Sequence, residues 1–450
     1  MIFALLPVQF VGLMKFAADF HIHSKFSRAT SKNMDLESLD KWAKIKGIKV
    51  LGTGDFTHPE WFRNLKEKLE PAEAGLFTLK SEIRNPKSET NSKFQIQNSK
   101  TRFILTVEIS CIYSKNSRVR KIHLLIFAPS FEAAEKINAH LGWIGNLRSD
   151  GRPILGLDAK EAAKIALNAS EDCLVIPAHC WTPWFAIFGS KSGFDSIEEC
   201  FDEYSKYIYA VETGLSSDPQ MNWRLSVLDK ITLISNSDCH SASKIGREAN
   251  VFDAELSYSG IAKAIKEKDP KKFLYTVEFF PEEGKYHYDG HRLCGVSLPP
   301  AESKKYNNIC PKCKKLLTIG VLNRVEELAD RPAFDKSSAG KPEGAIPFKS
   351  LVPLEEIIAD AFGVGTGTKQ VNQEYDNLIS KLHNEFNILL EASPEQLRAA
   401  TTPEIAEGIV RVREGRVKVE PGYDGVYGKV KIFGEDERKQ KAAGGQKALF

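Results

Sequence analysis

Nine side chains that can bind a metal ion recur along the first half of the sequence, each at or just past the end of an apolar run. Six are histidines, out of ten in the chain, and three are acids. Imidazole and carboxylate suit zinc, manganese or iron, and nine ligands suit two or three ions. Clustered ions activate water and attack phosphate esters, so the series predicts a hydrolase acting on phosphorus. The nine are His21, His23, Asp55, His58, Glu108, His123, His179, Asp238 and His240.

A single histidine at a strand end is more often structural than catalytic. His21 and His23 form an HxH pair, and side chains two apart on a strand point the same way. The joint pattern of HxH, DxxH, Glu, His, His and DxH favours a metal centre over the structural alternative.

Short apolar runs alternate with segments of helical periodicity from residue 16 to about 280. This alternation predicts an α/β fold with a parallel sheet, open or closed into a barrel, whose loops after the strands would gather the nine ligands. Residues 36–47 and 158–170 are predicted helices, the second capped by Asp158. Residues 80–100, rich in Ser, Asn and Lys, are predicted to be an inserted flexible surface loop.

The ordered motifs resemble the polymerase-and-histidinol-phosphatase (PHP) family. GTGDFTHP, PAHCWTPWF, FGSKSGFDSIEECF, ETGLSSDPQMNW, NSDCHS and ICPKCKKLLTIGVLNRVEELADRP together resemble endonuclease Q over about residues 15–440, apart from 80–100. The resemblance implies a PHP-type distorted (β/α)7 barrel over 14–280 that holds two or three Zn²⁺ ions, with Mg²⁺ or Mn²⁺ as alternatives for activity. It also implies an endonuclease that cuts DNA 5′ to deaminated bases (uracil, hypoxanthine, xanthine) or abasic sites.

Two rival functions stay open. One is a small-molecule phosphatase of the histidinol-phosphatase type, which would need neither a zinc unit nor a helical third. The other is a non-catalytic DNA-binding scaffold, which the full ligand set disfavours. The chain has no G-x-x-x-x-G-K-[ST] loop, so an ATP-driven motor is rejected.

Asp218, in GLSSDP just past an apolar run, could accept a proton or hold the attacking water. The alternative is a turn or helix-capping aspartate. Glu212 is a similar but weaker catalytic candidate.

Residues 281–330 are predicted to form a small zinc-binding unit. Cys310 and Cys313 have CxxC spacing and Cys294 lies nearby, so one further ligand is needed for a structural zinc. His291 is chosen because it precedes Cys294 by three residues; His287 and Asp289 are the alternatives. A redox-active CxxC is the other interpretation.

Several side chains are predicted to contact damaged DNA, although core or turn positions are the alternatives. Trp181 and Trp184 follow His179 directly, and an extruded base needs aromatic walls. A second loop and a glycine-rich turn could hold phosphates. The set is Trp181, Trp184, Ser190, Lys191, Gly365, Gly367 and Lys369.

Residues 331–425 are predicted to form a helical DNA-binding domain, and 426–450 a flexible tail. The final QKALF resembles sliding-clamp-binding peptides, with Gln446, Leu449 and Phe450 in contact with the clamp. The 450 residues carry a net charge of +3, so a basic surface must be local. The apolar start is too short to span a bilayer and Met14 is a natural alternative start. We expect a cytoplasmic monomer.

Overall fold

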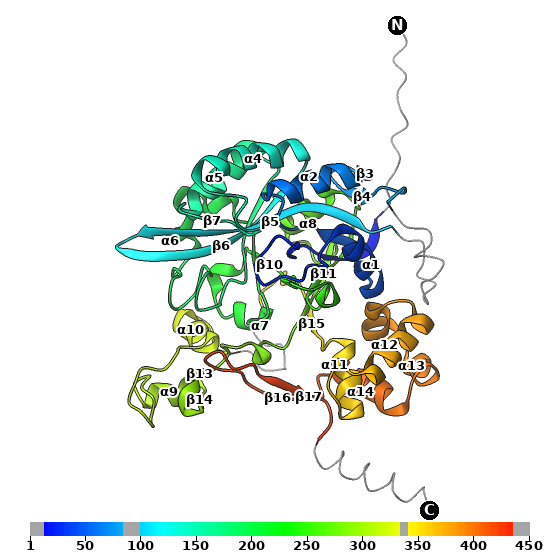
Figure 1. Ribbon diagram of the computed structural model, residues 1–450. Coiled ribbons are helices and arrows are strands. Elements are labelled where there is room, and N and C mark those ends of the chain that lie inside the picture. The colour runs from blue at the N-terminus through cyan, green and yellow to red at the C-terminus, as the bar shows by residue number, and fades with distance from the viewer. Residues whose placement is uncertain (1–12, 84–99, 334–340, 435–450) are drawn as a thin grey trace, which may run out of the picture.

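The computed structural model describes residues 13–83, 100–333 and 341–434, arranged as three regions (Figure 1). A large α/β region holds the first half of the chain. A small unit with α9, β13 and β14 lies below it on one side, and the helices α11–α14 lie below it on the other. Residues 84–99, which make up most of the predicted insertion, lie outside the described residues, and so does the QKALF motif.

One mixed sheet forms the frame of the α/β region. Among the described residues it has 11 strands, in the order β15-β12-β11-β1-β2-β5-β4-β3, with β6 on β5, β7 on β5 and β8 on β6. The strands are β1 Met14–Asp19, β2 Val50–Gly52, β3 Leu69–Pro71, β4 Phe77–Leu79, β5 Arg102–Lys115, β6 Arg118–Ala128, β7 Ile154–Leu155, β8 Leu174–Pro177, β11 Ala249–Ala254, β12 Phe273–Glu278 and β15 Phe348–Ser350.

The expectation of a parallel sheet is only partly correct. β1–β2, β2–β5, β5–β7 and β12–β15 are parallel, but β1–β11, β11–β12, β5–β6 and β6–β8 are antiparallel. No helix separates β5 from β6, which form one long hairpin. Its two-residue turn, Asn116–Ser117, has φ of 55° and 57°, the left-handed geometry that matches the twist of hairpin strands.

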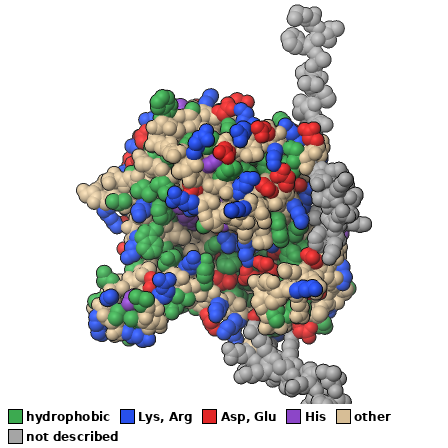
Figure 2. Space-filling model, in the orientation of Figure 1, with side chains coloured by type: hydrophobic (Ala, Val, Ile, Leu, Met, Phe, Trp, Pro, Cys, Tyr) green, Lys and Arg blue, Asp and Glu red, His purple; other side chains and the backbone are tan. Residues whose placement is uncertain are grey.

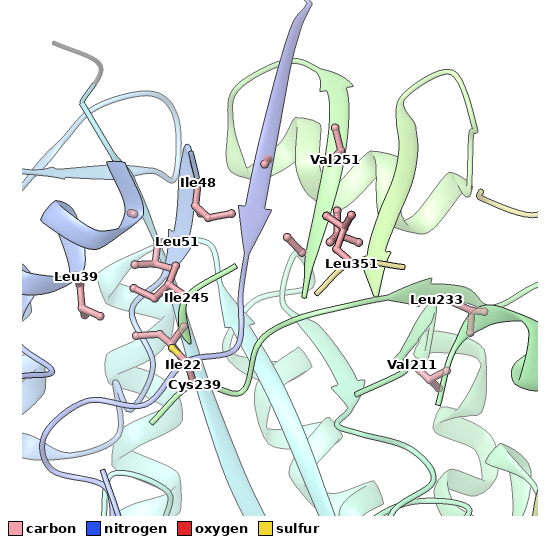
Figure 3. Packing of buried hydrophobic residues seen from close by; sticks show 14 of the residues in the cluster. Ile22, Leu39, Ile48, Leu51, Val211, Leu233, Cys239, Ile245, Val251 and Leu351 are labelled. Carbon is pink, nitrogen blue, oxygen red and sulfur yellow. The ribbon is translucent and has the colours of Figure 1, made fainter. Parts of the chain in front are cut away.

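Two further strands continue the frame beyond β8. β9 (Ala210–Glu212) and β10 (Thr232–Ile234) pair in parallel, and β9 lies beside β8. At the end of β10, Ser235 Oγ donates to the carbonyl of Val277 on β12 at 2.8 Å, so side-chain hydrogen bonds link this pair back to the sheet. Buried apolar residues pack against one another in the core, with Ile22 beside Cys239 and Ile245 near Leu51 (Figure 3).

The helices predicted at 36–47 and 158–170 are confirmed as α1 (Leu36–Lys46) and α5 (Ala159–Ala169). Asp35 and Asp158 cap them by accepting from Ser38 and Lys160 backbone N–H groups. The other α/β helices are α2 Pro59–Lys68, α4 Phe131–Ile144, α6 Ile197–Phe201, α7 Pro219–Asn222 and α8 Tyr258–Glu267. Short 3-10 helices are η1 Asp202–Tyr207, η2 Ser226–Leu228, η3 Ala242–Lys244, η4 Pro281–Glu283 and η5 Arg292–Cys294.

The C-terminal region contains helices, as predicted. They are α11 Leu354–Phe362, α12 Lys369–Leu382, α13 Pro394–Ala400 and α14 Pro403–Arg413, with a π-helical segment Asn387–Glu391 after α12. Ser393 and Gln396 make a reciprocal capping box at α13. Lys46 on α1 reaches Glu385 at 2.5 Å, both buried, so this bundle is anchored to the α/β region.

The predicted flexible tail is wrong for residues 426–434. β16 (Lys418–Glu420) and β17 (Lys429–Lys431) form an antiparallel ribbon, and Phe433 is buried. Phe433, two residues past β17, lies beside Gly408 of α14. The small unit contains β13 (Asp289–His291), β14 (Val296–Leu298), α9 (Pro300–Lys305) and α10 (Val321–Leu328). No helix of the described residues could span a membrane.

Glutamine at position 278 should make stability less sensitive to high pH. Glu278 is fully buried at the end of β12, and burial raises its pKa from 4.5 to about 8. The folded state therefore holds a proton that the unfolded chain releases between these values, so the free energy of unfolding falls as pH rises from 4.5 to 8, by up to about 1.4 kcal/mol per pH unit. Glu278→Gln, neutral throughout, should melt like the wild type near pH 5 and at higher temperature at pH 9. Thermal melts check this; Glu267→Gln, on the surface of α8, should melt like the wild type at both values.

Candidate metal centre

The HxH and DxH motifs lie side by side beyond the end of β1. Ile22 and Cys239 form a parallel β-bridge, and the N–H of His23 donates to the carbonyl of Cys239 at 3.1 Å. Ile22 faces the apolar core (Figure 3), so by alternation His21 and His23 face the other way. Asp238, which precedes Cys239, is thereby brought to both imidazoles.

These motifs and Glu108 form the first group of ligand atoms. Asp238 Oδ1 lies 3.6 Å from His21 Nε2 and 3.1 Å from His23 Nε2. Glu108 Oε2 lies 3.5 Å from the first of these nitrogens and 3.3 Å from the second. The four side chains offer atoms within 4.8 Å of one another, a spacing that one metal ion could satisfy.

A second group shares Glu108 with the first. Its Oε1 lies 2.6 Å from His123 Nδ1 and 3.0 Å from His179 Nε2. Glu108 on β5 and His123 on β6 are diagonal neighbours in the hairpin, since His123 pairs with Ser110. His179 follows β8, which pairs with β6. Because Glu108 turns one oxygen to each group, it is placed as a carboxylate that bridges two adjacent metal positions.

Asp55, His58 and His240 were also predicted as ligands, but they lie beside the two groups rather than in them. Asp55 accepts from His23 Nδ1 at 3.2 Å and from the N–H and hydroxyl of Ser24. The ring of His58 stacks on Phe26 at 4.3 Å, and the ring of His240 lies 4.5 Å from that of His23. In this geometry the carboxylate of Asp55 orients His23.

Three residues of this centre have strained backbone geometry. Asp55, His179 and Asp238 have φ of 51°, 31° and 45°, a left-handed region that L residues seldom occupy. Asp55 lies three residues past β2, His179 two past β8 and Asp238 four past β10, in the loops that aim these side chains at the centre. Such strain is typical of functional sites that the surrounding fold holds in place.

Glu212 orients the ligands His21 and His179 by accepting hydrogen bonds from them. At the end of β9 its buried carboxylate accepts from His21 Nδ1 at 3.0 Å, from the N–H of His179 at 2.8 Å and from Asn236 Nδ2 at 2.9 Å. The Nδ1–H tautomer leaves His21 Nε2 free to bind a metal, and that nitrogen is buried with no hydrogen-bond partner among the described residues. This unpaired nitrogen lies close to ligand atoms of three other side chains, so the site fits a metal ion.

Glu212→Gln should lower metal affinity about 10- to 100-fold, with a parallel loss of any metal-dependent activity. All three hydrogen-bond partners of Glu212 are donors. In Glu212→Gln the amide NH₂ replaces one accepting oxygen and cannot accept from them, so we expect the ring of His21 to turn. Metal titration of the full chain measures the effect. Glu203→Gln, on the exposed face of η1, is the matched control. Unchanged affinity in Glu212→Gln would contradict an orienting role.

Asp218 caps α7 and contacts neither group of ligands. Its carboxylate accepts from the N–H of Met221 at 2.8 Å, as the alternative interpretation expected. Burial raises the pKa of Asp218 to about 6, with Glu282 adding to the shift. Its proposed catalytic role stays a prediction.

Charge in the centre favours a cation. Burial alone would keep the imidazoles neutral, yet Glu212, Asp238 and Glu108 raise the pKa of His21 well above its usual value. Burial also opposes ionisation of Glu108, but His123, Arg152 and His21 hold its pKa well below the usual range. Glu108 is therefore ionised at neutral pH and available as a metal ligand.

The small unit brings His291 to the three cysteines. His291, Cys294, Cys310 and Cys313 offer ligand atoms within 4.8 Å of one another, a Cys3His set that suits structural zinc. Burial raises the pKa of the Cys310 thiol, but backbone N–H groups of Cys313 and Lys312 outweigh it and lower that pKa to about 6.

The two alternatives for the fourth ligand lie outside the Cys3His set. Asp289 instead accepts from the N–H of Gly320 at 2.7 Å and from Asn323 Nδ2 at 2.5 Å. His287 is buried, and burial lowers its pKa to about 4.

The structure divides the predicted aromatic DNA contacts. Trp181 is 1% exposed and its indole N–H donates to Asn222 at 2.8 Å, so it belongs to the core and cannot face DNA as predicted. Trp184 is 39% exposed and meets Tyr286 edge to face at 5.7 Å. Phe185 packs on the ring of His123 at 4.6 Å.

The polar DNA contacts lie in two loops. Lys191 is exposed, while Ser190 is half-buried with a hydroxyl that has no described partner. Gly365, Gly367 and Lys369 are exposed in the turn that leads into α12, whose N-cap Thr368 makes no side-chain capping bond. The first turn of α12 therefore has backbone N–H groups open to an anion.

Sequence reasoning missed Arg152. Its Nη1 donates to Glu108 Oε2 at 3.0 Å, which brings a guanidinium to the carboxylate shared by both groups. In the sequence it stands in a polar loop, RSDGRP, without a ligand motif or an apolar run to mark it.

Fold and centre together define a class: an α/β protein with a buried imidazole–carboxylate centre, a Cys3His cluster and a C-terminal helical region. Residues 353–416 match the family described as the MJ0043 C-terminal domain. MJ0043, an uncharacterized protein of Methanocaldococcus jannaschii, is 34% identical over 260 residues, which cover 56% of this chain but only 31% of that protein. YqxK, an uncharacterized protein of Bacillus subtilis, is 29% identical over 435 residues, 93% of this chain and 100% of YqxK.

Two solved structures resemble this chain over nearly its whole length. The lesion-specific endonuclease PfuEndoQ from Pyrococcus furiosus superposes with a TM-score of 0.79 at 29% identity, over 93% of this chain and 96% of that one. Endonuclease Q in complex with a 27-mer duplex that carries an abasic lesion at the active site gives 0.78 at 28% identity, over 94% of this chain and 98% of that one. The predicted resemblance to endonuclease Q is confirmed, and the chain has the fold of a lesion-specific endonuclease.

Proposed function

We propose that this protein is a metal-dependent DNA repair endonuclease that hydrolyses the phosphodiester 5′ to a deaminated base or an abasic site. One observation carries the proposal: two groups of ligand atoms share Glu108 inside a fold that matches a lesion-specific endonuclease along nearly the whole chain. In this proposal the α/β region is a distorted (β/α)7 barrel of the PHP type. The six grouped side chains are proposed as the ligands, and Asp55, His58 and His240 as residues that support them from outside the two groups.

The residues divide the work of the reaction. Bound divalent ions would supply an activated water and neutralise the phosphate oxygens. Glu212 and Asp55 hold the Nδ1–H tautomers of His21 and His23, so each ring presents Nε2 to the centre. Glu108 would be a ligand in both groups, with one carboxylate oxygen toward each. Asp218, which caps α7 outside both groups, is proposed to accept a proton from the attacking water or to hold that water.

DNA would be held by surfaces around the centre. The small unit projects as a separate lobe with many Lys and Arg side chains (Figure 2). Lys304, Lys305, Lys312, Lys314 and Lys315 belong to it. Phosphate contacts of this kind give affinity without sequence preference. Trp184 is proposed as an aromatic wall for an extruded base, and the turn before α12 as a phosphate contact.

Two rivals are less well supported. A histidinol-phosphatase-type enzyme has no use for a Cys3His unit and a helical bundle anchored to the catalytic region through Lys46 and Glu385. A non-catalytic scaffold would not be expected to keep six ligand side chains in two buried groups with their orienting carboxylates.

The function is tested with labelled oligonucleotides that carry one uracil, one hypoxanthine, one abasic site or no lesion, incubated with the full chain and Mg²⁺ or Mn²⁺. We expect a nick just 5′ of the lesion, absent from the undamaged strand and from His21→Ala/His23→Ala. His140→Ala, on the exposed side of α4, is the control for loss of a histidine. Turnover of a simple phosphate monoester without any nick would instead favour the phosphatase.

A sliding clamp is a proposed partner. Deletion of residues 446–450 should abolish binding to a clamp from the same organism, because Gln446, Leu449 and Phe450 would supply the contacts. The deletion should leave nicking of short oligonucleotides unchanged. Clamp binding is measured by pull-down with purified proteins, and retention by the deleted chain would contradict this partner.

A further inference from the structure

Arg152 presents a guanidinium to the metal centre. Its Nη1 lies 3.0 Å from Glu108 Oε2, the oxygen that also faces His21 and His23. The side chain is 27% exposed, so it reaches from the solvent side of the centre inward. A guanidinium has five N–H donors, and this is its one hydrogen bond among the described residues.

The loop that carries Arg152 is held rigidly in place. Asp150 Oδ1 accepts from the N–H of Arg152 at 3.1 Å and from that of Arg28 at 3.2 Å. The N–H of Gly151 donates to the carbonyl of Phe26 at 3.0 Å. A Cβ on Gly151 would collide with the carboxylate of Asp55, so a glycine is required at this close approach. The loop is thus fastened to the segment that follows the HxH motif.

This position suits a phosphate oxygen better than a structural ion pair. A guanidinium that served only to neutralise Glu108 would be expected to have its remaining donors paired inside the protein. Here they have no hydrogen-bond partner among the described residues, and the side chain is partly exposed beside the centre. Planar, fixed donors match the oxygens of a phosphodiester in geometry and charge.

We propose that Arg152 is a further catalytic residue, which binds a non-bridging oxygen of the scissile phosphate and stabilises the charge that grows there as water attacks. The inference rests on the proposed function. Arg152 forms no covalent bond and transfers no proton, because an arginine stays protonated throughout. Its contribution is electrostatic and directional, at the atom where negative charge develops.

The test measures the affinity of the metal-loaded full chain for inorganic phosphate. It compares the wild type with Arg152→Met, Arg152→Lys and the control Arg63→Met. Arg63 lies on the exposed face of α2, 3.8 Å from Glu67, so its loss matches the change in net charge. We expect phosphate to bind Arg152→Met about 10-fold more weakly or worse, with partial recovery in Arg152→Lys. Nicking should fall about 100-fold in kcat for Arg152→Met, and metal content should equal that of the wild type in every variant.

Three outcomes decide the question. Wild-type phosphate affinity in Arg152→Met overturns the proposal. Loss of metal from both Arg152 variants also overturns it, because Arg152 would then support the ligands rather than the substrate. If the wild type nicks no lesion while phosphate affinity depends on Arg152, the proposed function fails and the phosphate contact stands.

Discussion

Glu108→Gln should remove metal from both groups at once and reduce nicking by at least about 10³-fold. Glu108 is buried and contacts His123 at 2.6 Å, His179 at 3.0 Å and Arg152 at 3.0 Å. An amide keeps the shape but loses the charge, and its NH₂ must face either an imidazole pair or the guanidinium. Each metal position would lose an anionic ligand.

Metal equivalents per chain and single-turnover nicking rates measure the effect. Glu67→Gln, on the exposed face of α2, is the matched control and should retain both properties. If Glu108→Gln kept full metal content and lost activity alone, its role as a bridging ligand would be wrong.

The double variant Cys310→Ser/Cys313→Ser should lose one tightly bound metal equivalent and unfold the small unit, while the ions of the large centre stay bound. The described apolar cluster of this unit is small, with Val296, Cys310 and Leu317 buried in it. A segment with so little core depends on metal binding for its fold, and structural zinc contributes on the order of 10–16 kcal/mol. DNA affinity should fall with it, because the lysines lose their scaffold.

Metal analysis and limited proteolysis between residues 281 and 330 check this. Cys173→Ser, a buried cysteine outside any cluster of possible ligands in the described chain, is the control and should keep full metal content. An unchanged metal count, with a disulfide that forms and breaks reversibly, would instead support the redox interpretation of the CxxC.

Much of the centre could be predicted from the sequence because its ligands follow local rules. HxH places two rings on one side of a strand whatever the rest of the fold does, and strand ends in an α/β fold meet at one edge. Helix α5 could be predicted with its capping residue Asp158 for the same local reason. The four residues of the Cys3His cluster came from spacing alone, and the structure brings them together.

Tertiary structure alone decided how nine candidates divide. Asp55, His58 and His240 have the same residue types as the six grouped side chains, and only their distances separate them.

Trp181 and Trp184 are three residues apart, yet one is buried against Asn222 and the other is exposed. Local sequence does not record which face of a loop the rest of the chain will cover. Arg152 shows the same limit, because its approach to Glu108 depends on a loop packed between two distant segments. The sequence determines which residue types could bind a metal and the order in which they occur. Which of them acts as a ligand, an orienting residue or a substrate contact depends on contacts made across the whole fold.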